Sequence, residues 1–473
     1  MASRLPRSYP SAQRVAASGI MAFLDALAEI ELHSLMVLRH GKVIAEGWWG
    51  PYRPDEIQLG YSLSKSVTSI ALGYALSEGL FGLDDAVTDL FGADASSLDP
   101  RYGRLRVRDL AQMTTGHHTD PLEDVAEWPP LDAEPGGTWI YNNWATWKLG
   151  ELIQRRTGKP LSSYLEPRLF EPLDIEDWAW LRRGEYEQGF SGLHLATESW
   201  AKIGHLLLRG GELWDRQVIP AAYLEEATSV LVDTATEPDG RLRDVGADNR
   251  RGYGYQFWAS RHGYRAEGAL GQFLCVLPEA DAVLVLTAAN KDGQAVLDAV
   301  WTHLLPAFGE DARGSGAAEA PTADDEALTE RLGALTLPPL SSRAPDQAAS
   351  FRSGPENRVF TALQQLAASD DDRHWDLTLW LPCGTSTLRA GDGFWVTGEL
   401  STGARDALPV GASAGWSTED TFEIELRSLT TPHGIRIVCD STTGHFSTHW
   451  LAEPLWSAEF TDLAFATGLR HRG

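Results

Sequence analysis

The residues best suited to chemistry are Ser62 and Lys65, a serine and a lysine that stand three positions apart before an apolar run. A serine hydroxyl attacks an acyl carbon only when a base removes its proton. A lysine amine is such a base once burial lowers its pKa from about 10.4. A spacing of three brings the two side chains together on a helix. The pair therefore predicts a serine nucleophile that is activated by a lysine.

The element that must position this pair is a helix. Apolar residues recur at helical spacing after Lys65, and Gly79 is typical of a helix end, so we expect Ser62 in the first turn of a helix that ends near Glu78. The N-terminus of such a helix directs N–H groups and positive partial charge at an oxyanion. Two alternatives stay open: Ser64 as the nucleophile, and the serines and threonines of this segment as a polar helix flank.

A phenol and an amide follow about eighty residues later, at Tyr141 and Asn143. The glycines at 136–137 break the chain before them, and helical spacing begins at about residue 145, so both are predicted on a loop. Loops held between rigid elements often present reactive side chains. The structural alternative makes Tyr141 a packing aromatic and Asn143 a helix cap.

The elements around these residues predict an α+β fold. Two apolar runs between residues 34 and 49 are joined at His40-Gly41, which is a hairpin signal. Mostly helical and loop-like sequence follows, then an antiparallel meander of three strands between 264 and 287, and a helix over 295–305. This order predicts an antiparallel sheet flanked by helices, with an inserted all-helical lobe.

The chain divides into two domains and a linker. We predict that residues 1–308 form the first domain. The stretch 309–350 is rich in Ala, Gly, Asp, Ser and Pro and is predicted to be a linker with one short helix. Short segments of period-two alternation follow over 351–473, which predicts a C-terminal all-β domain, either a barrel or a sandwich.

Composition excludes several classes of function. The chain carries 66 acidic and 40 basic residues and a formal net charge of −26, which repels nucleic acid and anionic lipid. Its three cysteines lack the spacing of a zinc ribbon or a disulfide framework, and His117 and His118 have no second ligand cluster at a useful spacing. We expect no metal and no cofactor. No run resembles a signal peptide or a transmembrane helix, which predicts a cytoplasmic protein without a membrane partner.

Three motifs in this order carry a family resemblance: Ser62 to Lys65, Tyr141 to Asn143, and Ala266-Glu267-Gly268. With them, residues of about 15–305 resemble the serine β-lactamase-like superfamily, which includes penicillin-binding proteins, class C β-lactamases, family VIII esterases and 6-aminohexanoate-dimer hydrolases. The resemblance implies a β-lactamase/transpeptidase-like fold. It implies Ser62 as nucleophile, Lys65 as proton acceptor or electrostatic partner, and Tyr141 as a general base whose phenolate Lys65 would favour.

The same resemblance implies an oxyanion and substrate site. The oxyanion hole would consist of the backbone N–H groups of Ser62 and of Ala269, which follows Gly268 on its strand. Gly268 would admit the acyl group closely, and Asn143 would orient the lysine or hold a substrate amide. Gln272 ends an A-x-G-x-x-G-Q pattern that is also seen in esterase-like and aminohexanoate-type relatives.

One departure bears on the substrate. Penicillin-recognising relatives carry a lysine or histidine where Ala266 stands here, and Glu267 follows it. We therefore expect a serine hydrolase that acts through an acyl-enzyme on an ester, an amide or an amine-bearing small molecule, with weak or no β-lactamase activity. If the Arg265 side chain turned inward, its positive charge would weaken the argument from the acidic Glu267.

Other functions stay open from the sequence alone. They are an acyltransferase in biosynthesis, a binding or sensor protein that has lost turnover, and, third, a metal-dependent hydrolase that uses His117 or His118. A homo-oligomer also remains open.

Overall fold

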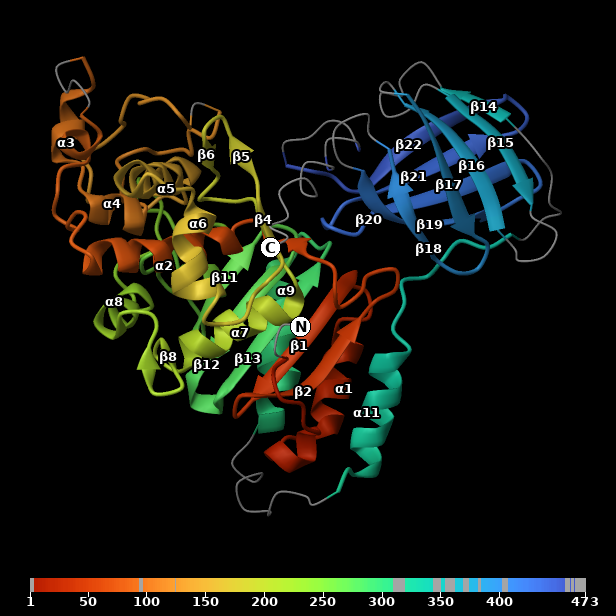
Figure 1. Cartoon of the computed structure of the whole chain (residues 1–473), viewed down its shortest axis with the longest axis horizontal. Coiled ribbons are helices and arrows are strands. Elements are labelled where there is room, and N and C mark those ends of the chain that lie inside the picture. Colours follow the sequence, from red (N-terminus) through yellow and green to blue (C-terminus); the bar gives the residue numbers. More distant parts are fainter. Residues whose placement is uncertain are drawn as a thin grey trace.

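The computed structural model describes residues 4–92, 97–123, 125–308, 320–342, 350–353, 362–368, 374–381, 384–401 and 407–455, together with 460 and 463. Two large sheets organise the chain, one built from residues before 290 and one from residues after 349 (Figure 1). Among the helices of these residues, none is long and apolar enough to cross a bilayer.

The first sheet has six antiparallel strands in the order β10-β11-β12-β13-β1-β2. They are β1 (Leu32–Arg39), β2 (Lys42–Trp48), β10 (Trp258–Ala259), β11 (Tyr264–Gly268), β12 (Gln272–Leu277) and β13 (Ala282–Ala288). The predicted hairpin is confirmed, because β1 and β2 are joined at His40 and Gly41, whose φ angles are 51° and 71°. The predicted meander is β11-β12-β13.

Helices cover both faces of this sheet. Met36 and Leu38 of β1 point into one core, with α2 (Leu63–Ser77) and α7 (Thr197–Leu208). Leu35 and Val37 point into another, with α1 (Ala17–Ala26), α9 (Gly293–Ala299) and α11 (Ala323–Gly333). All eight residues of β1 are buried, because a strand between two helical layers has no solvent-facing side. The predicted α+β class, an antiparallel sheet flanked by helices, is confirmed.

The inserted lobe lies along α2 (Figure 1). It contains α3 (Val87–Phe91), α4 (Val107–Gln112), α5 (Asn143–Thr157) and α6 (Leu161–Leu165), and α8 (Ala221–Ala227) follows after α7. The lobe is not purely helical. Short strands β4 (Trp178–Trp180) and β7 (Leu193–Leu195) join β3 (Gln58–Leu59), the segment just before α2, in a small sheet. The small hairpins are β5 (Arg182–Arg183) with β6 (Tyr186–Glu187), and β8 (Glu212–Leu213) with β9 (Arg216–Gln217).

Helix α11 falls inside the stretch predicted as a linker. Its Leu328 and Leu332 are buried in the core that α1 also enters, and its Arg331 forms an ion pair of 2.7 Å with Asp25. A capping box at Thr322 and Asp325 begins the helix. This part of the predicted linker therefore packs on the first domain.

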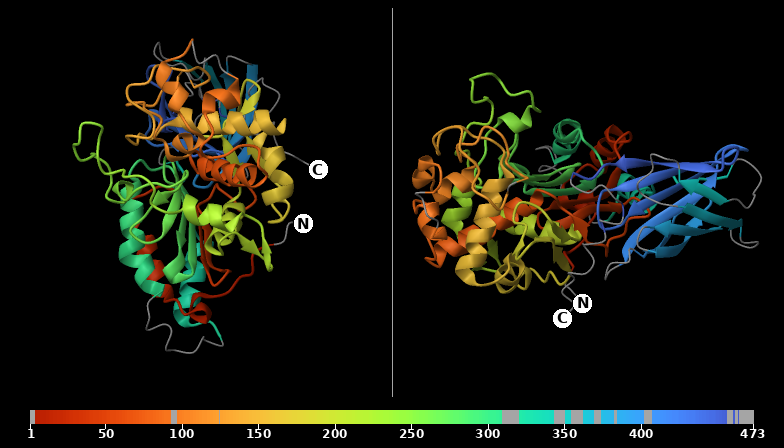
Figure 2. Two further views of the ribbon diagram at one scale, coloured as in Figure 1. Left: turned by 90° about the vertical axis from the view of Figure 1, so that its left-hand side faces the viewer. Right: turned by 90° about the horizontal axis from the view of Figure 1, so that it is seen from above.

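The second sheet has nine strands in the order β17-β16-β15-β14-β22-β21-β20-β19-β18. They are β14 (Ser350–Ser353), β15 (Ala362–Ala368), β16 (His374–Leu381), β17 (Gly384–Gly391), β18 (Val396–Leu400), β19 (Leu408–Trp416), β20 (Thr421–Ser428), β21 (Gly434–Asp440) and β22 (His445–Ala452). Because β17 also pairs with β19, the sheet closes on itself. Figure 2 shows it extending to one side of the first domain. The predicted all-β character is confirmed.

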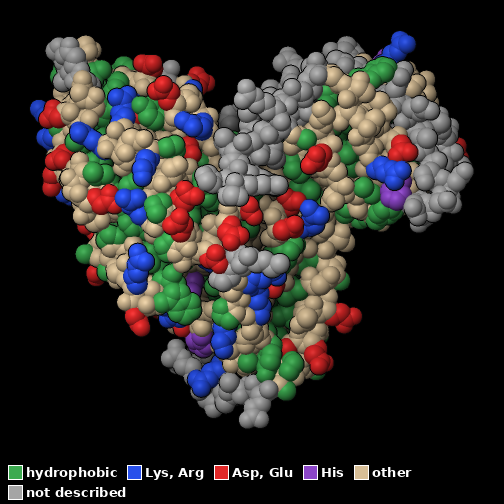
Figure 3. Space-filling model, viewed as in Figure 1, with side chains coloured by type: hydrophobic (Ala, Val, Ile, Leu, Met, Phe, Trp, Pro, Cys, Tyr) green, Lys and Arg blue, Asp and Glu red, His purple; other side chains and the backbone are tan. Residues whose placement is uncertain are grey.

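Two of the three cysteines lie among the described residues. Cys275 and Cys439 are free and buried, whereas Cys383 lies outside the described residues. On the face shown in Figure 3, acidic and basic side chains are interspersed over both domains.

Candidate active site

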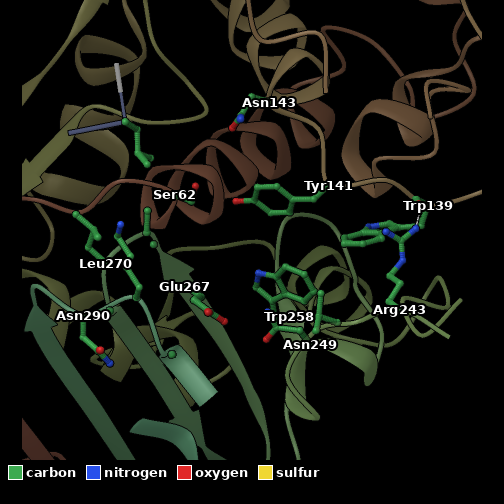
Figure 4. Close-up of a pocket in the computed structure, with 17 residues that line it drawn as sticks. Ser62, Trp139, Tyr141, Asn143, Arg243, Asn249, Trp258, Glu267, Leu270 and Asn290 are labelled. Carbon is green, nitrogen blue, oxygen red and sulfur yellow. Dashed lines mark hydrogen bonds between the residues drawn. The ribbon is translucent and has the colours of Figure 1, made fainter. Parts of the chain in front are cut away.

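A pocket of about 410 Å³ opens where the N-terminus of α2 meets the edge of β11. Ser62, Tyr141 and Asn143 line it together with Gly268 and Ala269, so five of the seven predicted site residues face one cavity (Figure 4). Lys65 lies directly beneath Ser62. Gln272 is not among the lining residues that the structure describes.

Ser62 occupies the N-cap position of α2, and Lys65 follows one turn later. The Lys65 Nζ donates a hydrogen bond to Ser62 Oγ at 3.0 Å. The prediction that Ser62 begins a helix ending near Glu78 is confirmed, because α2 ends at Ser77 with Glu78 as its C-cap. Ser62 therefore stands at the positive end of a helix and next to an amine.

The polar residues of α2 are buried, so the solvent-facing flank considered from the sequence is wrong. The Ser64 hydroxyl donates to Tyr61 O at 2.7 Å and accepts from the Leu193 N–H at 3.0 Å. Thr68 and Ser69 donate to backbone carbonyls of other segments at 2.7 and 2.6 Å. These hydroxyls hold the helix in place. The Ser64 hydroxyl, the alternative nucleophile, is already engaged in two structural hydrogen bonds.

Lys65 is 1% exposed and makes three hydrogen bonds through Nζ. Besides Ser62, its acceptors are Asn143 Oδ1 at 2.5 Å and Phe190 O at 2.8 Å. Burial lowers the pKa of Lys65 to about 7, although the nearby Asp120 carboxylate opposes this shift. A large fraction of this amine is thus unprotonated at neutral pH.

Tyr141 points its phenol toward Ser62 from the loop before α5 (Figure 4). Its ring stacks on Trp258 with centroids 5.7 Å apart, and Lys65 Nζ lies 4.9 Å from its centroid. Burial raises the pKa of Tyr141 well above its usual value. Burial therefore favours the neutral forms of both groups, and the amine of Lys65 loses its charge more readily than the phenol of Tyr141 gains one.

Asn143 is the first residue of α5 and not its cap. The cap is Asn142, whose Oδ1 accepts from the Ala145 N–H at 3.0 Å. Asp120 accepts from the backbone N–H of Asn143 at 2.9 Å and from its Nδ2 at 2.5 Å, which leaves Oδ1 to face Lys65. No sequence motif indicates a role for Asp120, because its partners come from segments far away along the chain.

The edge of β11 requires a glycine. A Cβ at Gly268 would stand 2.2 Å from Gly60 O, so no larger residue lets the strand approach the loop before Ser62 this closely. Ala269 was predicted to follow Gly268 on its strand. It lies instead in the turn after β11. In that turn Leu270 and Gly271 have φ angles of 62° and 83°.

The prediction that Gln272 belongs to the substrate site is wrong in its placement. Gln272 begins β12 and is 1% exposed. Its Nε2 donates to Leu270 O at 3.1 Å and to Ala288 O at 2.7 Å. The side chain thus fixes the turn that carries Ala269, and it acts on the pocket only through that turn.

The sequence indicated only some of the charged residues at the pocket. Glu267 lines it, but the fully buried Arg265 pairs with Glu267 at 2.7 Å, so the acid has an internal partner and argues less for an amine-bearing substrate. Ala266 is buried and supplies no cation. Arg243, which sequence reasoning missed, lines the far side and donates to Trp139 O at 2.7 Å.

His117, near α4, serves the structure. His117 is buried, and its Nδ1 lies 2.9 Å from the Thr115 hydroxyl. Burial lowers the pKa of His117 to about 4. Within the described part of the chain, no group of three or more His, Cys, Asp or Glu side chains is arranged to hold a metal ion.

Comparison with known proteins places this geometry in a family. The family model described as Beta-lactamase matches residues 22–306. The 6-aminohexanoate-dimer hydrolase of Paenarthrobacter ureafaciens is 24% identical over 296 residues, which cover 56% of this chain and 74% of that protein. The lovastatin esterase of Penicillium rubens is 25% identical over 172 residues, 29% of this chain and 42% of that protein.

A solved structure shares the fold. A Bacillus anthracis protein assigned as a 6-aminohexanoate-dimer hydrolase superposes with a TM-score of 0.51 and 18% identity over 70% of this chain and 86% of its own. This likeness confirms the β-lactamase/transpeptidase-like fold. Since the family model spans more than half of the sequence, from α1 to the end of the first domain, the chain belongs to the Beta-lactamase family.

Proposed function

We propose that this protein is a serine hydrolase that cleaves a small ester or amide through an acyl-enzyme on Ser62. The observation that carries the proposal is the Lys65 amine, which lies 3.0 Å from Ser62 Oγ and whose pKa is lowered to about 7. A neutral amine has two N–H donors and one lone pair. As an ammonium, Lys65 donates to Ser62 Oγ as well as to Asn143 Oδ1 and Phe190 O. Once it is neutral, Asn143 and Phe190 accept its two N–H groups, and the lone pair faces the Ser62 hydroxyl, which then donates to it.

In acylation, Ser62 Oγ attacks the acyl carbon while its proton passes to Lys65 Nζ. The carbonyl electron pair moves onto oxygen, where the backbone N–H groups of Ser62 and Ala269 are proposed to stabilise it. Collapse breaks the bond to the leaving group, which takes a proton from the Tyr141 hydroxyl. The Lys65 ammonium, whose Nζ lies 4.9 Å from the centre of the Tyr141 ring, then returns its proton to the Tyr141 phenolate through a water molecule that enters as the leaving group departs. Water then attacks the ester by the same steps in reverse and releases the acid.

The charges around the pocket favour an ester or amide over a penicillin. Ala266 offers no cation beside the reacting atoms, and the Arg265 guanidinium is already paired with Glu267. The volume of about 410 Å³ suits a small molecule.

Covalent labelling tests the proposal directly. A fluorophosphonate probe is expected to add one equivalent of phosphonyl group, and the modified peptide is expected to contain Ser62. With p-nitrophenyl butanoate, a burst of nitrophenol equal to the enzyme concentration would report the same acyl-enzyme. Labelling at another residue, or none, would refute the assignment. An acyl adduct that forms and never clears would indicate the binding or sensor alternative.

The pH profile should follow Lys65. Because the neutral amine is the base, kcat/KM should rise about tenfold per pH unit below pH 7 and level off above it, as a single group with the lowered pKa of Lys65 titrates. The measurement is kcat/KM for p-nitrophenyl butanoate between about pH 5 and pH 9. A rate that climbs only as pH approaches 10 would point instead to the phenolate of Tyr141.

Asp120→Asn should shift that profile. Removing the carboxylate removes a group that raises the pKa of Lys65, so the rising limb should move to lower pH. The maximal kcat should also fall about tenfold, because Asn143 loses the acceptor that orients its amide. Asp132→Asn is the matched control, since Asp132 accepts a backbone N–H of the same region at 2.7 Å. An equal effect of both substitutions would contradict a role for Asp120 at the site.

Acyl transfer to an alcohol or amine is the second candidate. One relative, the monacolin J acid methylbutanoyltransferase of Aspergillus terreus, is 28% identical over 149 residues, 24% of this chain and 36% of that protein. Product analysis with an added alcohol separates the two functions. A hydrolase yields mainly the acid, whereas a transferase yields mainly the new ester and turns over faster with the alcohol present.

A further inference from the structure

The C-terminal domain reaches the pocket. Among the pocket-lining residues that the structure describes, Leu455 alone comes from beyond residue 350. It follows β22 and is 51% exposed, unusually high for a leucine. Just before it, Ala452 is buried in one cluster with Leu270, and Ala269 packs against the same cluster. The end of β22 therefore lies against the turn that carries the proposed oxyanion N–H.

A buried chain of hydrogen bonds fixes this segment beside Ser62. His433 Nδ1 lies 2.9 Å from Ala452 O, which can only accept, so Nδ1 carries the hydrogen and Nε2 is an acceptor. Tyr61 Oη lies 2.5 Å from Nε2 and must donate to it. The backbone N–H of Leu455 lies near the Tyr61 hydroxyl, where it opposes the rise in the pKa of Tyr61 that burial causes. The residue before Ser62 is thus linked through His433 to Ala452 and lies beside Leu455.

Tyr61 is held in an unusual conformation at this junction. Its φ is +48°, in the left-handed region that non-glycine residues adopt only when their surroundings impose it. Its ring is buried with Leu59 and Ala452, and the Leu59 N–H donates to Thr430 O at 2.8 Å. The C-terminal domain therefore contacts both loops that flank Ser62, at 59–61 and at 269–271.

The pocket has distinct sides for the two halves of an ester. In the proposed mechanism, the leaving group takes its proton from Tyr141 and so lies on the Tyr141 side. Figure 4 shows Leu270 on the opposite side of Ser62 from Tyr141, Trp139 and Arg243. The acyl chain must then run toward Leu270, where Leu455 also lines the cavity.

We propose that the C-terminal domain completes the active site, with Leu455 as the apolar wall that selects the acyl chain. This inference rests on the proposed acyl-enzyme function. Residue 455 acts here as a specificity residue. Tyr61 and His433 act as positioning residues, because they fix the position of Ser62 relative to Leu455.

Esters with one leaving group and different acyl chains test the wall. Against p-nitrophenyl acetate, butanoate and octanoate, Leu455→Trp should lower kcat/KM for octanoate relative to acetate about tenfold or more by filling the pocket. Leu455→Ala should lower kcat/KM for butanoate relative to acetate severalfold, because it removes apolar contact with the acyl chain. Phe394→Ala, which truncates an exposed apolar side chain of the same domain away from the pocket, should leave both ratios unchanged.

Rates are taken per active site titrated with the fluorophosphonate, so that a partly unfolded variant does not mimic a change of specificity. If both Leu455 variants keep the wild-type ratios of kcat/KM between the esters while Ser62 is still labelled and ester is still hydrolysed, Leu455 does not select the acyl chain. The proposed hydrolase function would stand in that case. A wild-type protein that is neither labelled nor active would overturn both.

The positioning role of Tyr61 is tested separately. Tyr61→Phe removes the hydroxyl and its hydrogen bond to His433, and it should lower kcat on the acetate about tenfold with little change in KM. Tyr74→Phe removes a phenol that donates to Arg168 O at 3.1 Å from the other end of α2. If Tyr61→Phe lowers kcat no more than Tyr74→Phe does, Tyr61 only packs and the positioning role is refuted.

Discussion

Ser62→Ala is expected to lower kcat on p-nitrophenyl butanoate by on the order of a millionfold, the usual loss when a serine hydrolase loses its nucleophile. The substitution removes the one oxygen that both Lys65 Nζ and Tyr141 contact at the head of α2. It should also abolish fluorophosphonate labelling. Substrate binding should persist, because the pocket walls come from other residues.

Ser64→Ala is the control that separates the nucleophile from its rival. Ser64 is fully buried, and its hydroxyl bonds Tyr61 O and the Leu193 N–H. Its removal should cost about 1–3 kcal/mol of stability, because a buried N–H loses its acceptor. Labelling of Ser62 should remain. If Ser64→Ala were the inactive and unlabelled variant, the assignment of the nucleophile would be wrong.

Lys65→Met should lower kcat by about a thousandfold, within the range that a positioned general base supplies. Methionine nearly matches lysine in length and is compatible with burial, so the fold should tolerate it. The Ser62 hydroxyl, however, loses the acceptor of its proton. The rise of kcat/KM around pH 7 should vanish with the group that titrates there.

Lys202→Met controls for the loss of a buried lysine. Lys202 is 7% exposed and donates to Asp174 O at 2.7 Å, away from the residues that line the active-site pocket. It should keep kcat and the pH profile while changing the melting temperature. Equal losses of kcat in the two variants would show that Lys65 acts through stability alone.

Local pattern predicted the elements that carry the site. The spacing of apolar residues after Lys65 predicted α2, and the structure confirms it from Leu63 to Ser77. The hairpin at His40-Gly41 and the meander of β11-β12-β13 were predicted for the same reason, because periodicity and turn residues act over a few positions.

The alternation that predicted the second domain does not mark every strand of its sheet. In β19, eight of nine residues are buried, so no period of two marks it. A Cβ at Gly411 would stand 2.3 Å from Pro51 Cγ, so this glycine permits contact with the first domain. Such a constraint comes from a residue 360 positions away and leaves no local signal.

By itself, the sequence determined that α2 presents Ser62 and Lys65 on one face, and its order of motifs determined the family. Only the tertiary structure decided the protonation states, because burial of Lys65 and Tyr141 depends on every element packed around them. It also decided which polar residues serve the chemistry. Gln272 holds a turn, Asp120 orients Asn143, and Leu455 reaches the pocket from the second domain, since each side chain finds its partners across distances that no sequence motif spans.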